Sequence, residues 1–104
     1  MVHPNNHEWI YVSSRGVGSV SVFHLGKDRD ILTKVQEVRL HGTWPRSMSL
    51  SPCGQVLAVA DQMGDSVQVL GVSKFNGILV STIDNKDIIL RTPHQPSFVK
   101  FLDF

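Results

Sequence analysis

The sequence predicts an all-β fold built from repeated sheets of antiparallel strands. Three observations support this fold class: the chain repeats itself at a constant spacing, its apolar residues alternate with polar ones, and turn-forming residues separate the alternating segments. No window of about a dozen residues carries the apolar stripe of an amphipathic helix. Short strands joined by turns are therefore the predicted elements throughout.

The internal repeat has an offset of 47 residues. Residues 18–25 (GSVSVFHL) match residues 65–72 (DSVQVLGV), so that Ser19 corresponds to Ser66. The other matched segments are 10–14 with 57–61, 31–38 with 78–85 and, at an offset of 48, 3–6 with 51–54. A third partial copy at 95–101 resembles 44–50. A constant period over this many positions indicates a repeat architecture.

Each repeat carries the alternation of half-buried strands. Val20 and Val22 alternate with serines, and the same pattern returns at 66–69. Aliphatic and aromatic residues dominate 9–13 and 56–60. The predicted strands of the first copy are 9–13, 18–25 and 31–38, and those of the second are 45–50, 55–60, 66–72 and 78–83.

Turn chemistry separates these strands. Pro4-Asn5-Asn6 and Ser51-Pro52-Cys53-Gly54 each precede a strand, and Asn76-Gly77 lies between the last two strands of the second copy. An Asn-Gly pair favours the positive φ of a tight hairpin turn. It therefore predicts a chain reversal between Val72 and Ile78.

Four antiparallel strands in about 47 residues match the size of a β-propeller blade. We predict one partial β-propeller domain over residues 1–104. Within it, 1–41 is a blade that lacks its inner strand, 42–85 is a complete blade, and 86–104 supplies the inner strand of the next blade near 98–102.

Composition excludes several classes of function. A formal net charge of +1 without any run of Lys and Arg argues against binding to nucleic acid or to an anionic membrane. The lone Cys53 excludes an internal disulfide, and the longest apolar run, 56–60, is far shorter than the ~20 residues of a membrane helix. With no signal-peptide pattern, we expect a cytoplasmic protein. His3 and His7 lie in a turn, so we expect no metal and no cofactor.

Residues 11–23 (YVSSRGVGSVSVF) and 42–70 (GTWPRSMSLSPCGQVLAVADQMGDSVQVL) together resemble the C-terminal blades of the lactonase family of seven-bladed propellers. This family includes the propeller-type 6-phosphogluconolactonases and the carboxymuconate cycloisomerases. The resemblance runs from about His3 to Phe101 and implies about two blades of seven. Two departures are visible: Met48 stands where the family usually has Phe, and Asp61-Gln62 where Asn-Gln is common.

The resemblance implies an anionic substrate, a sugar lactone or a muconate-type acid, and makes Arg46 the candidate catalytic residue. A guanidinium binds carboxylate or phosphate through two parallel hydrogen bonds, and it can stabilise the oxyanion formed when water attacks a lactone. The alternative for Arg46 is a structural salt bridge or stacking on Trp44.

Arg15, Gln62 and His41 are the candidate substrate-binding residues. Arg15 lies in a turn where family members carry a matching arginine, and Gln62 occupies the equivalent turn one repeat later. An amide there suits hydrogen bonding to hydroxyl groups or to water. His41 lies before Gly42 and could take part in acid–base chemistry. For Arg15 and His41 the alternative is an exposed turn or loop residue without a role in binding, and for Gln62 it is an amide that forms hydrogen bonds within its own turn.

Two functions of different classes remain open from the sequence. The first is a segment of an enzyme that hydrolyses an anionic sugar lactone such as 6-phosphogluconolactone, or that catalyses the related lactonisation of a muconate. The second is a non-enzymatic propeller segment that acts as an interaction scaffold. The set of Arg15, Arg46 and Gln62 favours the first, because a scaffold has no need of this set on one face.

We expect this chain alone to be inactive, because it offers no general base; the family's candidates, a Glu and a His, lie in earlier blades. The expected partners are a small anionic lactone or carboxylate, and either the remaining blades of a longer chain or further copies of this one. Self-association is expected because the segments 9–12 (WIYV) and 98–102 (FVKFL) would leave strand edges unpaired.

Overall fold

A computed structural model describes residues 1–4, 8–26, 31–63, 65–73, 76–80, 88–91 and 100. Every regular element in this part of the chain is a β-strand, which confirms the predicted all-β class. The strands are β1 (Trp9–Ser14), β2 (Ser19–Leu25), β3 (Leu32–Arg39), β4 (Pro45–Leu50), β5 (Val56–Asp61), β6 (Ser66–Val72), β7 (Leu79–Val80) and β8 (Ile88–Arg91). No helix in the described residues is long and apolar enough to cross a membrane.

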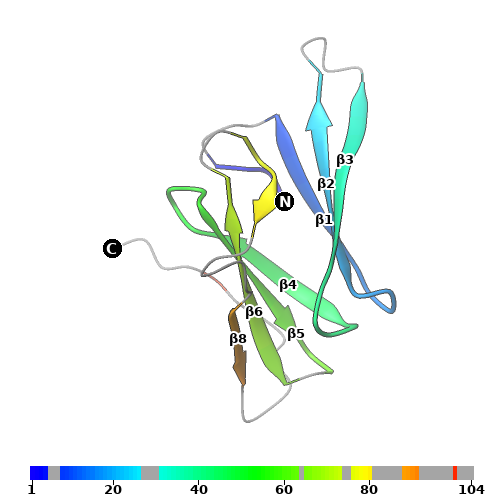
Figure 1. The fold of residues 1–104 in the computed structure, drawn as a ribbon, viewed down its shortest axis with the longest axis vertical. Coiled ribbons are helices and arrows are strands. Elements are labelled where there is room, and N and C mark those ends of the chain that lie inside the picture. Colours follow the sequence, from blue (N-terminus) through cyan, green and yellow to red (C-terminus); the bar gives the residue numbers. More distant parts are fainter. Residues whose placement is uncertain are drawn as a thin grey trace.

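The first sheet has the strand order β1-β2-β3, with antiparallel neighbours (Figure 1). Residues 1–3 run along the free edge of β1: the Tyr11 N–H donates to the Met1 carbonyl at 2.7 Å, and the His3 N–H donates to the Trp9 carbonyl at 2.9 Å. A bridge between Val2 and Ile10 completes this contact. The N-terminus thus occupies the place of the inner strand that we predicted this blade to lack, and it partly covers the edge at 9–12.

The second sheet has the order β4-β5-β6-β7, and β8 also pairs with β6 (Figure 1). β7 pairs only with Gly71 and Val72, which leaves Ser66–Val69 of β6 free to pair with β8. The structure differs here from the sequence prediction, which assigned 86–104 to the next blade, because 88–91 belong to the second sheet. The predicted strand 78–83 begins as β7, and its continuation lies outside the described residues, as does the predicted strand 98–102 apart from Lys100.

The hydrophobic core lies between the two sheets. The first sheet contributes Tyr11, Val20 and Val22, which are all fully buried. The second sheet contributes Leu57, Val59, Leu70, Val72 and Leu79. Because side chains of a strand alternate between faces, the period-2 pattern of the sequence places each of these sets on one side of its sheet.

The turn at Asn76-Gly77 reverses the chain as predicted, and the Ser73 N–H donates to the Ile78 carbonyl at 2.9 Å. The reason for glycine is different from the one that the sequence suggested, because Gly77 does not have a positive φ. A Cβ atom at Gly77 would overlap the ring of Trp9 instead. The Gly77 carbonyl also accepts a hydrogen bond from the Tyr11 hydroxyl at 2.7 Å, which ties the two sheets together.

Burial raises the pKa of the Tyr11 hydroxyl to about 12. Because the folded-state pKa lies above the ordinary value of 10.0, folding stability from this group is complete below pH 10 and is lost as the pH rises through 12. Tyr11 is the single tyrosine of the chain, so absorbance at alkaline pH reports its titration alone. We expect a midpoint near 12 in the folded chain and near 10 in denaturant.

The matched control is Tyr11→Phe, which keeps the ring and removes the hydroxyl. We expect this variant to lose about 1–2 kcal/mol of stability at neutral pH, because the buried Gly77 carbonyl loses its donor. The extra loss of stability between pH 10 and 12 should be absent from it, although lysines titrate in both proteins. A tyrosine midpoint near 10 in the folded chain would show that the hydroxyl is solvated.

Candidate functional site

Several polar side chains gather at one end of the two sheets. The turn 15–18 between β1 and β2 meets the linker 40–44 that joins the sheets: the Gly16 N–H donates to the Thr43 carbonyl and the Leu40 N–H to the Gly18 carbonyl, both at 2.7 Å. The start of β4 and the turn after β5 lie beside the same linker, because the Gln62 N–H donates to the Trp44 carbonyl at 3.1 Å. Turns and linkers from both sheets therefore build this end together.

Trp44 lies at the centre of this end. Its backbone N–H donates to Asp61 Oδ1 at 3.2 Å, and the residue is 37% exposed. The guanidinium carbon of Arg15 lies 6.0 Å from the centre of the Trp44 ring, which is the outer range of a cation–π contact. The sequence suggested Arg46 as the residue that could stack on Trp44, but the structure places Arg15 there.

Arg46 lies on β4 and is exposed. Its Nη1 donates to Gln62 Oε1 at 3.2 Å, so two of the predicted site residues are in direct contact. The ion pairs among the described residues join Lys34 to Glu37 and His24 to Glu8, and neither involves Arg46 or Arg15. Arg46 thus contacts a neutral amide and keeps its positive charge and further N–H donors for an anion.

His41 lies in the same linker and is exposed. The contact that the structure shows is made by its backbone, whose N–H donates to Gln68 Oε1 at 2.8 Å. The structure therefore places Arg15 beside the Trp44 ring and joins Arg46 to Gln62, whose backbone contacts Trp44, whereas the contact that it gives for His41 is made by the backbone. Their roles in substrate binding stay predictions.

Arg39 is a residue of this end that the sequence did not single out. It is the last residue of β3, and its Nη1 donates to the Val17 carbonyl at 3.2 Å. This bond ties β3 to the turn that carries Arg15 and brings a third guanidinium to the same end. No motif marks Arg39, because only the pairing of β2 with β3 places it beside that turn. We call Arg15, Arg39 and Arg46 the arginine cluster.

Asp61 is a second residue of this end that the sequence did not predict as part of a site. The sequence showed it only as a departure from the family pattern. It is 5% exposed, and although Oδ1 accepts the Trp44 N–H, Oδ2 is buried without a hydrogen-bond partner. Gly42 packs against this carboxylate so closely that a Cβ atom there would overlap Oδ2. Asp61 therefore holds the linker 42–44 in place.

The side chains at this end are of the types that bind anions. Exposed arginines, an amide and an indole ring can bind a phosphate or carboxylate next to an apolar surface. Among the described residues, no group of three or more His, Cys, Asp or Glu side chains could hold a metal ion. Cys53 is exposed, and the Ser51 hydroxyl and the backbone at Gln55 lower its thiol pKa, but it lies in the turn between β4 and β5, at their other end.

Comparisons with known proteins agree on the type of fold. A family model described as a lactonase, seven-bladed β-propeller, matches residues 2–101. A Bacteroides fragilis protein assigned as a 6-phosphogluconolactonase has a solved structure that superposes with a TM-score of 0.79, at 29% identity over 99% of this chain. A protein from Lactobacillus plantarum gives a TM-score of 0.81 at 26% identity over 93% of the chain.

A third solved structure, the periplasmic gluconolactonase of Pseudomonas aeruginosa, has a TM-score of 0.73 at 21% identity over 89% of the chain, and it supports the fold alone. The chain spans between 27% and 28% of the length of these three proteins. No curated protein sequence matches it.

Proposed function

The chain belongs to the lactonase family of seven-bladed β-propellers, and from this premise we propose that it carries part of a site that binds an anionic sugar lactone for hydrolysis. The observation that carries the proposal is the gathering of Arg15, Arg46 and Gln62 around Trp44. These residues come from both sheets and from segments up to 47 residues apart. A scaffold that only stacks its sheets has no need of such a group at one end.

The positive charges of the arginine cluster match the negative charges of the substrate and of the oxyanion that forms during lactone hydrolysis. Water attacks the lactone carbonyl carbon, and negative charge develops on the carbonyl oxygen before the ring C–O bond breaks and the leaving oxygen takes a proton. Arg46 would stabilise this oxyanion, since preorganised donors act where charge develops. Arg15 would bind the acidic group of the substrate, and the Gln62 amide would donate to its hydroxyl groups. Trp44 offers a flat apolar surface to the sugar ring.

The finer proposal is that the substrate resembles 6-phosphogluconolactone. The Bacteroides fragilis neighbour supports this choice. The guanidinium groups of Arg15 and Arg46 support it as well, because a guanidinium binds a phosphate through two hydrogen bonds and therefore more tightly than it binds a neutral sugar. We expect the general base that activates water to lie in other blades, as the resemblance implies, and we give the buried Asp61 no part in catalysis. We therefore expect no turnover by this chain alone.

The test is the binding of 6-phosphogluconate, the stable product of the reaction, to the chain and its variants by calorimetry. Arg46→Lys keeps the positive charge but loses the planar fork, so we expect the Kd to rise about tenfold, which corresponds to about 1.4 kcal/mol. The Tm should stay within a few degrees, because Arg46 is exposed. Lys34→Gln, which removes a charge outside the cluster, is the control and should leave the Kd unchanged.

The opposite pattern would identify Arg46 as a structural residue: a lower Tm with the same Kd in the remaining folded protein. Equal affinity for 6-phosphogluconate and for inorganic phosphate would contradict a sugar-lactone site. Hydrolysis of 6-phosphogluconolactone by the chain alone, above the uncatalysed rate, would show that this chain supplies its own base.

A further inference from the structure

The turn between β6 and β7 holds a reactive pair of residues, Asn76-Gly77. Asn76 is exposed, and its Oδ1 accepts the Ile78 N–H at 3.0 Å, a local hydrogen bond that is typical of Asn in turns. This bond closes a ring of atoms that includes Asn76 Cγ and the Gly77 nitrogen, and so it holds the two near each other. A donor on Oδ1 also makes Cγ more open to attack by a nucleophile.

The Gly77 nitrogen is the nucleophile that lies nearest along the chain. When it loses its proton to base and attacks Asn76 Cγ, a bond forms between the two atoms, the bond from Cγ to Nδ2 breaks, and the amide nitrogen takes up a proton and leaves as ammonia. Water then opens the five-membered succinimide. If the new bond to Cγ breaks, aspartate results. If the original peptide bond breaks, the main chain runs through Cβ and Cγ as isoaspartate.

Packing between the sheets keeps glycine at position 77. Glycine favours this reaction because no side chain shields its nitrogen and its backbone turns freely. A Cβ atom at Gly77 would overlap the ring of Trp9 from the first sheet. Larger residues, which would protect Asn76, are therefore excluded, and the fold retains the reactive pair.

The two products differ in their effect on the contact between the sheets. Aspartate leaves the main chain unchanged and keeps an acceptor for the Ile78 N–H. Isoaspartate adds one carbon atom to the main chain directly before Gly77, whose carbonyl accepts the Tyr11 hydroxyl at 2.7 Å. The added atom moves this carbonyl, so the hydrogen bond between the sheets is lost.

The chain beyond the turn is held by a different contact. Gln36 Nε2 donates to the Leu79 carbonyl at 2.9 Å, and the Leu79 N–H donates to Gln36 Oε1 at 2.8 Å. This pair of bonds fixes the start of β7 against the first sheet. We therefore expect the change at position 76 to stay within the turn and to leave the rest of the chain folded.

We propose that Asn76 is a site of spontaneous deamidation in the folded chain, and that its isoaspartate product releases the Tyr11 hydroxyl from Gly77 and weakens the contact between the sheets. The reaction needs only water and base, and it is independent of the substrate proposed above.

The site is tested by incubating the folded 104-residue chain at mildly alkaline pH and mapping its tryptic peptides by mass spectrometry. The peptide 75–86 also contains Asn85, which precedes a lysine and is the internal control. We expect a mass gain of one dalton at Asn76 at least about tenfold faster than at Asn85, because glycine leaves its nitrogen unshielded. Asn76→Ser keeps an acceptor for the Ile78 N–H but has no amide, so this position should not change.

The effect on the sheets is measured by urea unfolding of the separated isoaspartate form at one fixed chain concentration. This form should unfold at a lower urea concentration than the wild type. Asn76→Asp is the matched control, because it has the same charge and an ordinary main chain, and it should unfold close to the wild type. The loss caused by isoaspartate should be smaller in Tyr11→Phe, where the bond to Gly77 is already absent.

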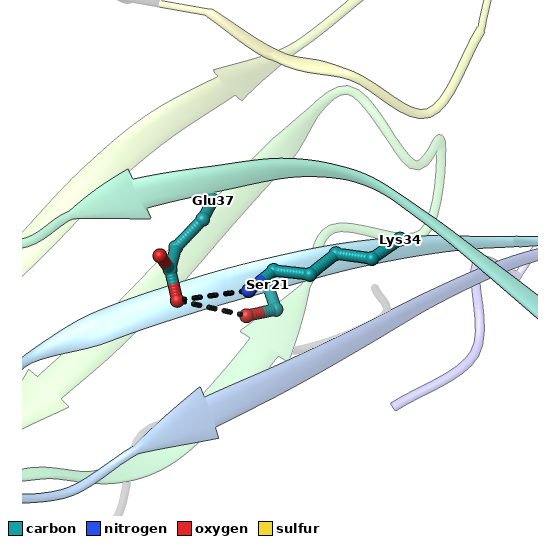
Figure 2. A network of polar contacts seen from close by, with 3 residues as sticks. All are labelled: Ser21, Lys34 and Glu37. Atoms are coloured by element: carbon teal, nitrogen blue, oxygen red, sulfur yellow. Dashed lines mark hydrogen bonds and ion pairs between the residues drawn. The ribbon is translucent and has the colours of Figure 1, made fainter.

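A second control changes the charge outside the turn. Lys34→Gln removes one positive charge from the exposed pair that Lys34 Nζ forms with Glu37 Oε1 at 3.2 Å on β3 (Figure 2). It alters the net charge as deamidation does, and it should unfold close to the wild type because exposed ion pairs contribute little.

Three results would overturn the proposal. A mass gain at Asn76 that appears only in denaturant would show that the native turn protects the amide. An isoaspartate form as stable as Asn76→Asp would show that the added carbon atom does not disturb the contact. An equal loss of stability in Tyr11→Phe would show that the Tyr11 hydroxyl is not what isoaspartate releases.

Discussion

Gly18→Ala is expected to lower the free energy of unfolding by about 3–5 kcal/mol, the largest effect that we predict for a substitution in this chain. Gly18 has a φ of +74°, a conformation that an L-residue adopts only with strain. A Cβ atom there would overlap the Gly42 carbonyl oxygen and lie 2.7 Å from Thr43 Cα. Both are backbone atoms, so the turn 15–18 and the linker between the sheets would have to separate.

Gly16→Ala is the matched control in the same turn. Gly16 has a φ of +83°, but nothing lies within 4 Å of the position of its Cβ atom. The substitution therefore adds conformational strain without a clash, and we expect a loss of only about 1–2 kcal/mol. Urea unfolding at one fixed chain concentration measures both, because association would otherwise add to the apparent stability. Equal losses of unfolding free energy in the two variants would show that the linker moves to make room for the Cβ atom at residue 18.

The Gly18→Ala variant also tests whether the contact between the turn 15–18 and the linker positions Arg15 for binding. Arg15 reaches Trp44 only because the turn 15–18 contacts the linker 40–44. If the turn moves away, the affinity for 6-phosphogluconate should fall together with stability, whereas Gly16→Ala should keep it. Loss of affinity in both variants would mean that the conformation of the turn, and not its contact with the linker, positions Arg15.

Asp61→Ala has the second-largest expected effect, a loss of about 2–3 kcal/mol. The substitution removes the acceptor of the Trp44 N–H and leaves a space beside Gly42, where the carboxylate now packs. Asp61 is 5% exposed, so water replaces the lost acceptor poorly. The Trp44 indole should also become more exposed, which shifts its fluorescence to longer wavelength.

Asp61→Asn is the informative comparison. It keeps an acceptor for the Trp44 N–H and removes a charge from a site where Oδ2 is buried without a partner. We expect stability equal to or above that of the wild type, since burying an uncompensated charge is unfavourable. Asn is also the residue that family members commonly carry at this position. If Asp61→Asn loses as much stability as Asp61→Ala, the negative charge itself holds the linker.

The sequence by itself determined the all-β class and the positions of most strands, because alternation and turn chemistry depend on residues that are neighbours along the chain. The repeat at an offset of 47 also predicted which positions of the two sheets correspond. The core residues of both sheets all lie at apolar positions of the strands that these patterns predict. The resemblance added Arg15, Arg46 and Gln62 as candidates for one site.

Only the tertiary structure decided which residues contact one another. It places Arg15 rather than Arg46 beside Trp44, pairs β8 with β6 and brings Arg39 to the turn that carries Arg15. It also shows that Gly77 is required for space beside Trp9, whereas the sequence suggested a backbone conformation. The physical reason is the same in each case. These contacts join segments far apart in sequence, and they form because the strands and sheets pack against one another. A local sequence pattern predicts only which side of its own strand a residue faces.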